Sequence, residues 1–289
     1  MPRPQSMRWY ERGADAVARV RPDLPRCYIC PTGEGSFPPE HAGKLSREHV
    51  PPQGLGLASR PLVLICGGCN SRFGSGPDVQ MLRVQTLVRF PRGAMQRPER
   101  VRMVTGGLTV RTDLSTRDGT YEIVVLPREN DPAIQSRFET EVPELLAEGR
   151  EFHIQIPGCS EVETTAGWLR VGYLVAFATF GYRYALSDEL APVRAHITDP
   201  SGSPLPTYYN AVPEAAESDR WVAAVVDPPD MRSIVVNVAH HRVFLPVPDD
   251  AEFYDRRASE RQRLGRAARR LRAKAFHWPR EPMHLLDFS

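Results

Sequence analysis

The sequence predicts an α+β protein: a small N-terminal module with paired cysteines, then a mixed α+β domain that ends in a basic helix. Three observations predict this. Two Cys-x-x-Cys pairs lie within residues 27–69, a long apolar segment follows residue 164, and valine-rich segments occupy residues 220–248. The module is expected at residues 1–95 and the second domain at residues 96–289.

Length and composition favour a globular protein of about two domains. The chain has 289 residues, of which 41% are hydrophobic and 25% are charged, so it can build a core of its own. The first 20 residues lack the apolar core of a signal peptide. The most apolar stretch, 168–186, is interrupted by Arg170 and Arg183, which argues against a membrane span. We therefore expect a cytoplasmic protein with no membrane partner.

The net charge is only +2, but it is unevenly distributed along the chain. Residues 255–274 carry nine basic residues against Asp255 and Glu260, a local charge of +7, so the rest of the chain sums to −5. This asymmetry indicates a local anionic partner rather than a globally basic protein.

Apolar spacing predicts the elements of the N-terminal part in chain order. Residues 7–20 form a short amphipathic helix, and the apolar run 62–65 with its β-branched members predicts a strand. A helix then begins near Cys69 or just after Pro77 and runs to about Val88.

The second part of the chain combines strands and helices. A helix that Thr165 caps runs to about Tyr184 and is apolar on most sides, which is typical of a buried helix. A turn is expected at Asp118-Gly119. We expect strands at 101–111, 121–126, 153–156, 221–226, 233–239 and 242–246, and further helices at 132–149, 190–197 and 252–276.

The four paired cysteines predict a structural zinc site. Cys27-x-x-Cys30 and Cys66-x-x-Cys69 have the spacing that lets two thiolates bind one ion. Four thiolates fill a tetrahedral site, so this Zn²⁺ would brace a region too small to build a core. The alternative is four unrelated buried cysteines. Paired spacing also favours metal binding in a reducing cytosol over disulfides.

Glu48-His49 and then Pro51 lie between the two pairs, and Asn70 follows the last cysteine. This combination resembles the HNH endonuclease family in its zinc-knuckle, ββα-metal form, over about residues 25–82. The resemblance implies two antiparallel strands and a helix around one catalytic ion, Mg²⁺ or Mn²⁺. It implies His49 as the general base, with Glu48 and Asn70 as ligands of that ion. Nucleases of this type act in phage defence, on phage genomes or in mobile elements.

Hydrolysis of phosphodiesters suits these residue types. A hard divalent cation prefers oxygen ligands and keeps open positions for water and phosphate. It stabilises the charge that develops on the phosphorane and on the leaving 3′ oxygen. An imidazole with an ordinary pKa of about 6.5 is a suitable base near neutral pH.

Two positions depart from the family pattern. Pro61 stands where many members have an asparagine that orients the histidine, so a backbone carbonyl would have to orient His49. No histidine follows Asn70 on the helix. Asp78 is either a further ligand or a cap of the helix after Pro77, and we leave it out of the predicted metal set.

The basic segment predicts contact with phosphates. Arg263, Arg266 and Arg270 would follow a duplex backbone without reading its sequence, so the expected partner is double-stranded DNA. The alternative for this segment is a solvated helix, or one that binds an acidic partner. For the whole protein, the alternative to an endonuclease is a catalytically inactive zinc-ribbon protein that binds nucleic acid, which Pro61 favours. A third possibility is a toxin or effector whose nuclease is triggered through the C-terminal domain.

Overall fold

Helices and antiparallel sheets together confirm the α+β class. No helix in the part of the chain with described coordinates is long and apolar enough to cross a membrane. The predicted helix 7–20 lies outside that part. The computed structural model describes residues 45–57, 60–95, 97–149, 151, 153–206, 208–212, 216, 218–264 and 271–280.

The chain divides into two compact units, with boundaries after Asp78 and after Thr164. Residues 79–164 form the second unit, and the chain on both sides of them forms the first. This division differs from the expected domains 1–95 and 96–289, because the C-terminal segment folds with the N-terminal one.

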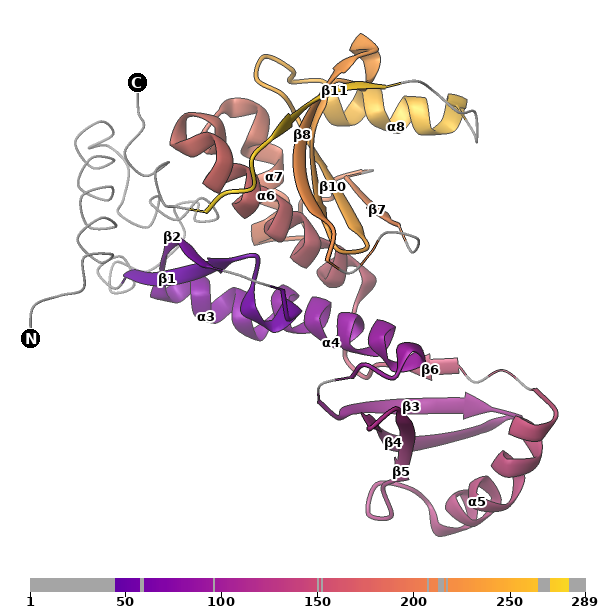
Figure 1. Cartoon of the computed structure of the whole chain (residues 1–289). Helices are drawn as coiled ribbons and strands as arrows, with labels where there is room; N and C mark the ends of the chain where they lie inside the picture. The colour runs from indigo at the N-terminus through magenta and orange to yellow at the C-terminus, as the bar shows by residue number, and fades with distance from the viewer. Residues whose placement is uncertain are drawn as a thin grey trace, which may run out of the picture. The chain divides into compact units, whose positions relative to one another are not determined.

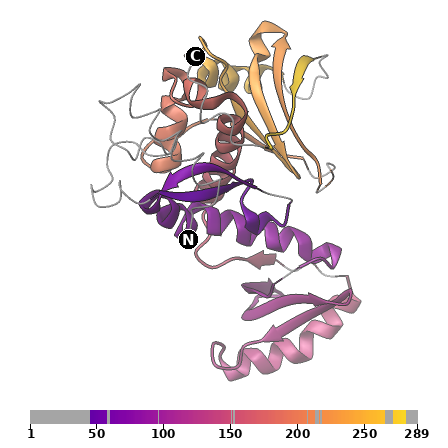
Figure 2. The same cartoon turned by 60° about the vertical axis from the view of Figure 1, so that its left-hand side comes forward.

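The first unit begins with a hairpin and a helix. β1 (Leu45–Val50) pairs antiparallel with β2 (Arg60–Cys66), and α3 (Gly67–Ser75) follows directly and packs against both strands. Figures 1 and 2 both show the hairpin beside α3. The strand predicted at 62–65 is thus confirmed as part of β2, and the described residues have the ββα order that the family resemblance implied.

A helix begins at each of the two predicted positions in this region, near Cys69 and near Pro77. α3 begins before Cys69, and a separate helix, α4 (Pro77–Arg89), begins after a turn at Gly76. Pro77 explains the break, because proline has no N–H to continue the bonding of α3 yet fits the first turn of a new helix.

A five-stranded antiparallel sheet forms the main body of the first unit, in the order β11-β8-β9-β10-β7. The three predicted valine-rich strands are confirmed as β8, β9 and β10, whereas β7 and β11 were not predicted. The strands are β7 (Tyr209–Ala211), β8 (Arg220–Asp227), β9 (Ser233–Val238), β10 (His241–Leu245) and β11 (Arg272–Phe276).

Helices cover both faces of this sheet. Figure 1 shows α6 (Glu161–Ala185) and α7 (Ala191–Thr198) on one side and α8 (Phe253–Leu264) on the other. Every residue of β9 is buried, as expected for a strand covered on both faces. The predicted helix is confirmed as α6, but it begins at Glu161, so Thr165 lies inside it and the prediction that Thr165 caps it is wrong. Non-helical backbone at Gly181 interrupts the helix near its end.

The predicted basic helix ends earlier than expected. α8 confirms its first part, but the prediction that it runs to residue 276 is wrong, because 272–276 form β11 and pair with β8 at the edge of the sheet. The arginines of this segment do not distinguish a helix from a strand, because arginine is compatible with a helix and with an exposed edge strand. β11 gains backbone hydrogen bonds from β8, which sequence periodicity does not reveal.

The second unit is a four-stranded antiparallel sheet with a helix on one face, in the order β5-β4-β3-β6. Its elements are β3 (Glu99–Thr105), β4 (Leu108–Arg117), β5 (Thr120–Val125), β6 (His153–Gln155) and α5 (Pro132–Ala147). Its core contains Met95, Val101, Met103, Val110, Leu114, Phe138 and Val142. The short 3₁₀ turns of the chain are Gln53–Leu55, Phe90–Arg92, Asp188–Leu190 and Pro229–Met231.

One predicted strand of the second unit is a hairpin. The expected strand 101–111 is wrong, because Gly106 and Gly107 adopt positive φ values of 54° and 80° and reverse the chain between β3 and β4. A Gly-Gly pair is a known hairpin signal, and here it overrode the apolar alternation on either side. The predicted Asp118-Gly119 turn is confirmed, with φ values of 49° and 76°.

α6 lies very close to the sheet at one point. A Cβ atom added at Gly172 would lie 2.6 Å from Cβ and Cγ1 of Val243 on β10. One turn earlier, the ring of Trp168 stacks on His241, with ring centroids 3.5 Å apart, and Tyr209 Oη lies 2.6 Å from His241 Nδ1. A glycine and two stacked rings therefore define how the helix sits on the strand.

We expect Gly172→Ala to destabilise the protein by roughly 1–3 kcal/mol, because the added methyl group must displace Val243 or the helix. Thermal and denaturant unfolding measure the effect. Gly74→Ala is the matched control, since a Cβ there meets nothing within 4 Å and adds helix propensity. Equal unfolding free energies for the two variants would contradict the close approach.

We expect His241 to make the fold sensitive to acid. Burial, and secondarily the neighbouring His240, lower its pKa from 6.5 to about 3. The unfolded chain therefore binds a proton that the folded protein does not, and stability falls as the pH drops from about 6.5 towards 3, by about 1.4 kcal/mol per pH unit at most. Unfolding free energies measured across this range should fall less steeply for His241→Gln than for the wild type. Parallel curves would show that His241 does not contribute.

Candidate functional site

The predicted Glu48-His49 pair lies at an irregular point of β1. The register with β2 shifts between these two residues, which marks a β-bulge. The side chain of Glu48 is buried, whereas His49 is half-buried. The register skips Leu62, so the extra residue belongs to β2, and the alternation of β1 gives Glu48 and His49 different surroundings.

The ring of His49 meets an amide that the sequence did not indicate. Gln53 Nε2 lies 3.0 Å from His49 Nε2. The amide can present either its nitrogen or its oxygen to the ring after a half-turn, and with its oxygen on Nε2–H it leaves Nδ1 as the acceptor that a general base needs. Pro61 is the strand partner of His49 and has no side-chain amide, and Gln53 supplies one to the ring. The only sequence signal was its four-residue distance from His49.

Asn70 lies near the start of α3, as expected, and is half-buried. Phe73 follows it by three residues, so the two share a face of the helix. The guanidinium carbon of Arg170, on α6, lies 4.8 Å from the centroid of the Phe73 ring. The face of α3 that carries Asn70 is thus close to the group that also contacts Glu48.

Arg170 is the functional candidate that sequence reasoning missed. In the sequence it only interrupts an apolar helix, but its side chain is 0% exposed and holds two carboxylates. Its Nη1 donates to Asp78 Oδ2 at 2.5 Å, and its Nη2 lies 3.3 Å from Glu48 Oε1. Asp78 is the second residue of α4, and its carboxylate pairs with Arg170.

The electrostatics of this cluster follow from burial. Burial raises the pKa of Glu48, and Asp78 raises it further, while the Arg170 guanidinium opposes both effects. Burial likewise raises the pKa of Asp78 against the influence of Arg170. With both carboxylates ionised, two negative charges face one guanidinium, so the cluster retains a net charge of −1.

These residues fit a hard divalent cation. Carboxylate and amide oxygens are the ligands that Mg²⁺ and Mn²⁺ prefer, and Glu48 and Asn70 supply them. Asp78 Oδ1 is buried, and no hydrogen-bond donor reaches it from the described part of the chain. A buried oxygen acceptor of this kind is suited to a hydrogen-bond donor or a positive charge nearby.

The predicted zinc site lies mostly outside the described residues. Cys27 and Cys30 fall there entirely, and so does the side chain of Cys66, which ends β2. Cys69 is buried in the first turn of α3. Among the side chains that are described, no group of three or more His, Cys, Asp and Glu residues could hold a metal ion.

Most of the arginines predicted to contact DNA also lie outside the described residues. Arg266 and Arg270 lie there, and Arg263 lies on α8 with its side chain outside. Two other arginines of the same segment contact the protein itself. Nη1 and Nη2 of Arg256 both donate hydrogen bonds to the carboxylate of Asp250. The guanidinium carbon of Arg257 lies 3.5 Å from the centroid of the Phe244 ring.

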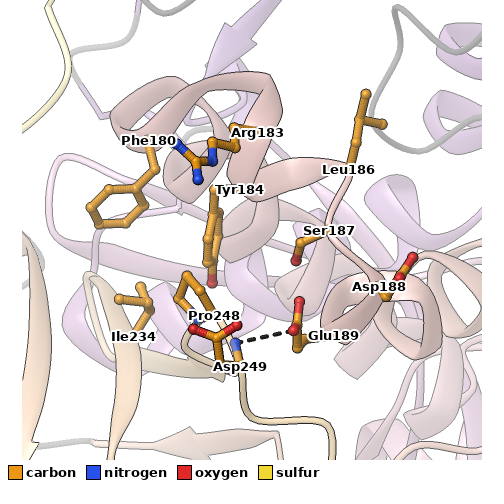
Figure 3. Close-up of a pocket in the computed structure, with 10 residues that line it drawn as sticks. All are labelled: Phe180, Arg183, Tyr184, Leu186, Ser187, Asp188, Glu189, Ile234, Pro248 and Asp249. Atoms are coloured by element: carbon orange, nitrogen blue, oxygen red, sulfur yellow. Dashed lines mark hydrogen bonds between the residues drawn. The ribbon is translucent and has the colours of Figure 1, made fainter. Parts of the chain in front are cut away.

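A separate pocket of about 650 Å³ lies beside the end of α6 (Figure 3). Its lining includes three acidic residues, Asp188, Glu189 and Asp249, and one arginine, Arg183. Glu189 accepts a hydrogen bond of 3.0 Å from the backbone N–H of Asp249. An excess of negative charge repels phosphate, so this pocket does not suit the backbone of a nucleic acid.

Comparison of the chain with protein-family models, with curated proteins and with solved structures finds no match.

Proposed function

We propose that this protein is a metal-dependent endonuclease that hydrolyses phosphodiester bonds in DNA. One observation supports this most strongly. The β1–β2 hairpin and α3 form a ββα arrangement in which Glu48 and His49 lie where the register of the hairpin shifts and Asn70 lies in the first turn of the helix. The two sequence motifs thus lie on elements that pack against each other.

Each side chain has a role in the proposed reaction. His49, oriented by Gln53, removes a proton from the attacking water. Glu48 and Asn70 would hold Mg²⁺ or Mn²⁺ through their oxygen atoms. When bound, such an ion stabilises the charge of the transition state and of the leaving 3′ oxygen. The four cysteines Cys27, Cys30, Cys66 and Cys69 would bind a structural Zn²⁺ that braces the module.

Substrate binding and location belong to the same proposal. Arg263, Arg266 and Arg270 would contact phosphates of double-stranded DNA, and the protein would act in the cytoplasm, where thiolates stay reduced. By its resemblance to HNH nucleases, its target would be phage or mobile-element DNA. The C-terminal part would select the substrate or regulate cleavage.

The test is nicking of plasmid DNA by full-length, zinc-loaded protein in Mg²⁺ or Mn²⁺. We expect His49→Ala to lower the rate by roughly 10²–10⁴-fold, because the general base is lost. His153→Ala, a change of the same kind at an exposed residue of β6, should cleave as the wild type does.

Folding and metal content must be equal in the two variants, as shown by thermal unfolding and elemental analysis. If the zinc-loaded wild type cuts neither DNA nor RNA with any divalent metal, the enzyme proposal fails and a nucleic-acid-binding protein remains. Retention of full activity by His49→Ala would remove His49 from the mechanism.

Gln53 should set the pH dependence of cleavage. We expect Gln53→Ala to slow cleavage by roughly tenfold to a hundredfold, because the ring of His49 loses its fixed orientation. Gln53→Glu places a carboxylate beside Nε2, which favours the charged imidazolium and should move the acid limb of the pH–rate profile to higher pH. Gln135→Ala, at a half-buried position of α5, is the control. An unchanged profile in Gln53→Glu would separate Gln53 from the base.

A further inference from the structure

Arg170 connects the hairpin to the C-terminal half of the first unit. Its guanidinium contacts Glu48 on β1, Phe73 on α3 and Asp78 at the start of α4. Three elements, β1, α3 and α4, therefore meet at one side chain that comes from α6, about a hundred residues later in the chain.

The position of that guanidinium is determined by the sheet. Successive residues of an α-helix turn by about 100°, so Arg170 lies nearly opposite Trp168 and Gly172 on α6. Those two residues pack closely on His241 and Val243 of β10. The side of α6 that faces the sheet is therefore tightly packed, and the opposite side presents Arg170 to Glu48.

The cluster differs from a closed structural ion pair. A guanidinium needs one negative charge for neutrality, yet it meets two carboxylates, and Asp78 Oδ1 has no donor among the residues described. Glu48 also remains 8% exposed, whereas Arg170 is fully buried. The ion pair with Arg170 thus places the Glu48 carboxylate at the edge of the buried cluster, 3.3 Å from the guanidinium.

We propose that Arg170 is a positioning residue that holds the Glu48 carboxylate in the orientation needed to bind the divalent ion. This inference rests on the proposed nuclease function. It means that α6 and the C-terminal sheet complete the catalytic unit, so residues 1–95 do not contain the whole of it. Partners that orient a metal ligand typically account for 10–100-fold in metal affinity or activity.

The decisive variant is Arg170→Lys in the full-length, zinc-loaded protein. Lysine keeps the positive charge but lacks the planar fork that reaches Glu48 and Asp78 together. With the charge unchanged, we expect Mn²⁺ binding, measured by calorimetry without DNA, to weaken by roughly tenfold or more. Plasmid nicking at saturating Mn²⁺ should slow by a similar factor.

Arg194→Lys is the matched control. Arg194 lies on α7 and donates to the carbonyl oxygens of Ala185 and Ser187, so it supports the end of α6. We expect this variant to bind Mn²⁺ and to cleave within twofold of the wild type. Thermal unfolding reports the folded fraction of each variant, and Arg170→Met provides a second test in which the charge is removed as well.

The outcomes separate the two proposals. A folded Arg170→Lys protein with wild-type Mn²⁺ affinity and wild-type cleavage would show that Arg170 is only structural. Tighter Mn²⁺ binding in Arg170→Met, with unimpaired cleavage, would show that the guanidinium competes with the ion, and would also overturn the inference. If the wild type cleaves and only the Arg170 inference fails, the nuclease proposal stands. If the wild type neither binds Mn²⁺ nor cleaves, both fail.

Discussion

The guanidinium of Arg170 is the interaction on which the geometry of the first unit depends. It is closed off from water and carries a full charge, and its ion pairs with Glu48 and Asp78 offset the cost of burying that charge. Loss of one partner from such a buried pair typically destabilises a protein by about 3–5 kcal/mol. The hairpin, the start of α4 and α6 are therefore linked by an electrostatic constraint in addition to apolar packing.

α6 can serve two surroundings because it is buried on nearly every side. One side is fitted to the sheet by Gly172 and the ring of Trp168, and the other carries a charged group into the module. The sequence of this helix is therefore apolar on most sides, although one side packs on the sheet and the other carries the buried charge of Arg170. Its N-terminal and middle turns are regular, and the break at Gly181 comes only after these contacts.

β1 gives two neighbouring side chains different surroundings. Successive residues of a strand point to opposite faces, and the extra residue at the register shift lies on β2. Glu48 is buried against Arg170, while His49 is half-buried and meets Gln53 in the following 3₁₀ turn. A metal ligand and a base could in this way approach one phosphate from adjacent positions in the chain.

Much of the fold could be predicted because local patterns carry it. The apolar period of α6, the valine-rich strands of the sheet and the Asp118-Gly119 turn are short-range signals, and each is confirmed. Where two local signals favoured different structures, the prediction from sequence was wrong. Alternation suggested one strand over 101–111 although Gly106-Gly107 reverses it, and the basic run suggested a helix where β11 pairs with a distant strand.

The sequence by itself determined the α+β class, the helix that carries Asn70 and the candidate chemistry of Glu48, His49 and Asn70, because these depend on residue type and spacing. Only the tertiary structure decided that Arg170 reaches Glu48 and Asp78, that Gln53 meets His49, and that the C-terminal segment folds with the module. Those contacts join residues through the packing of separate elements, and no period or spacing along the chain records which elements will pack together.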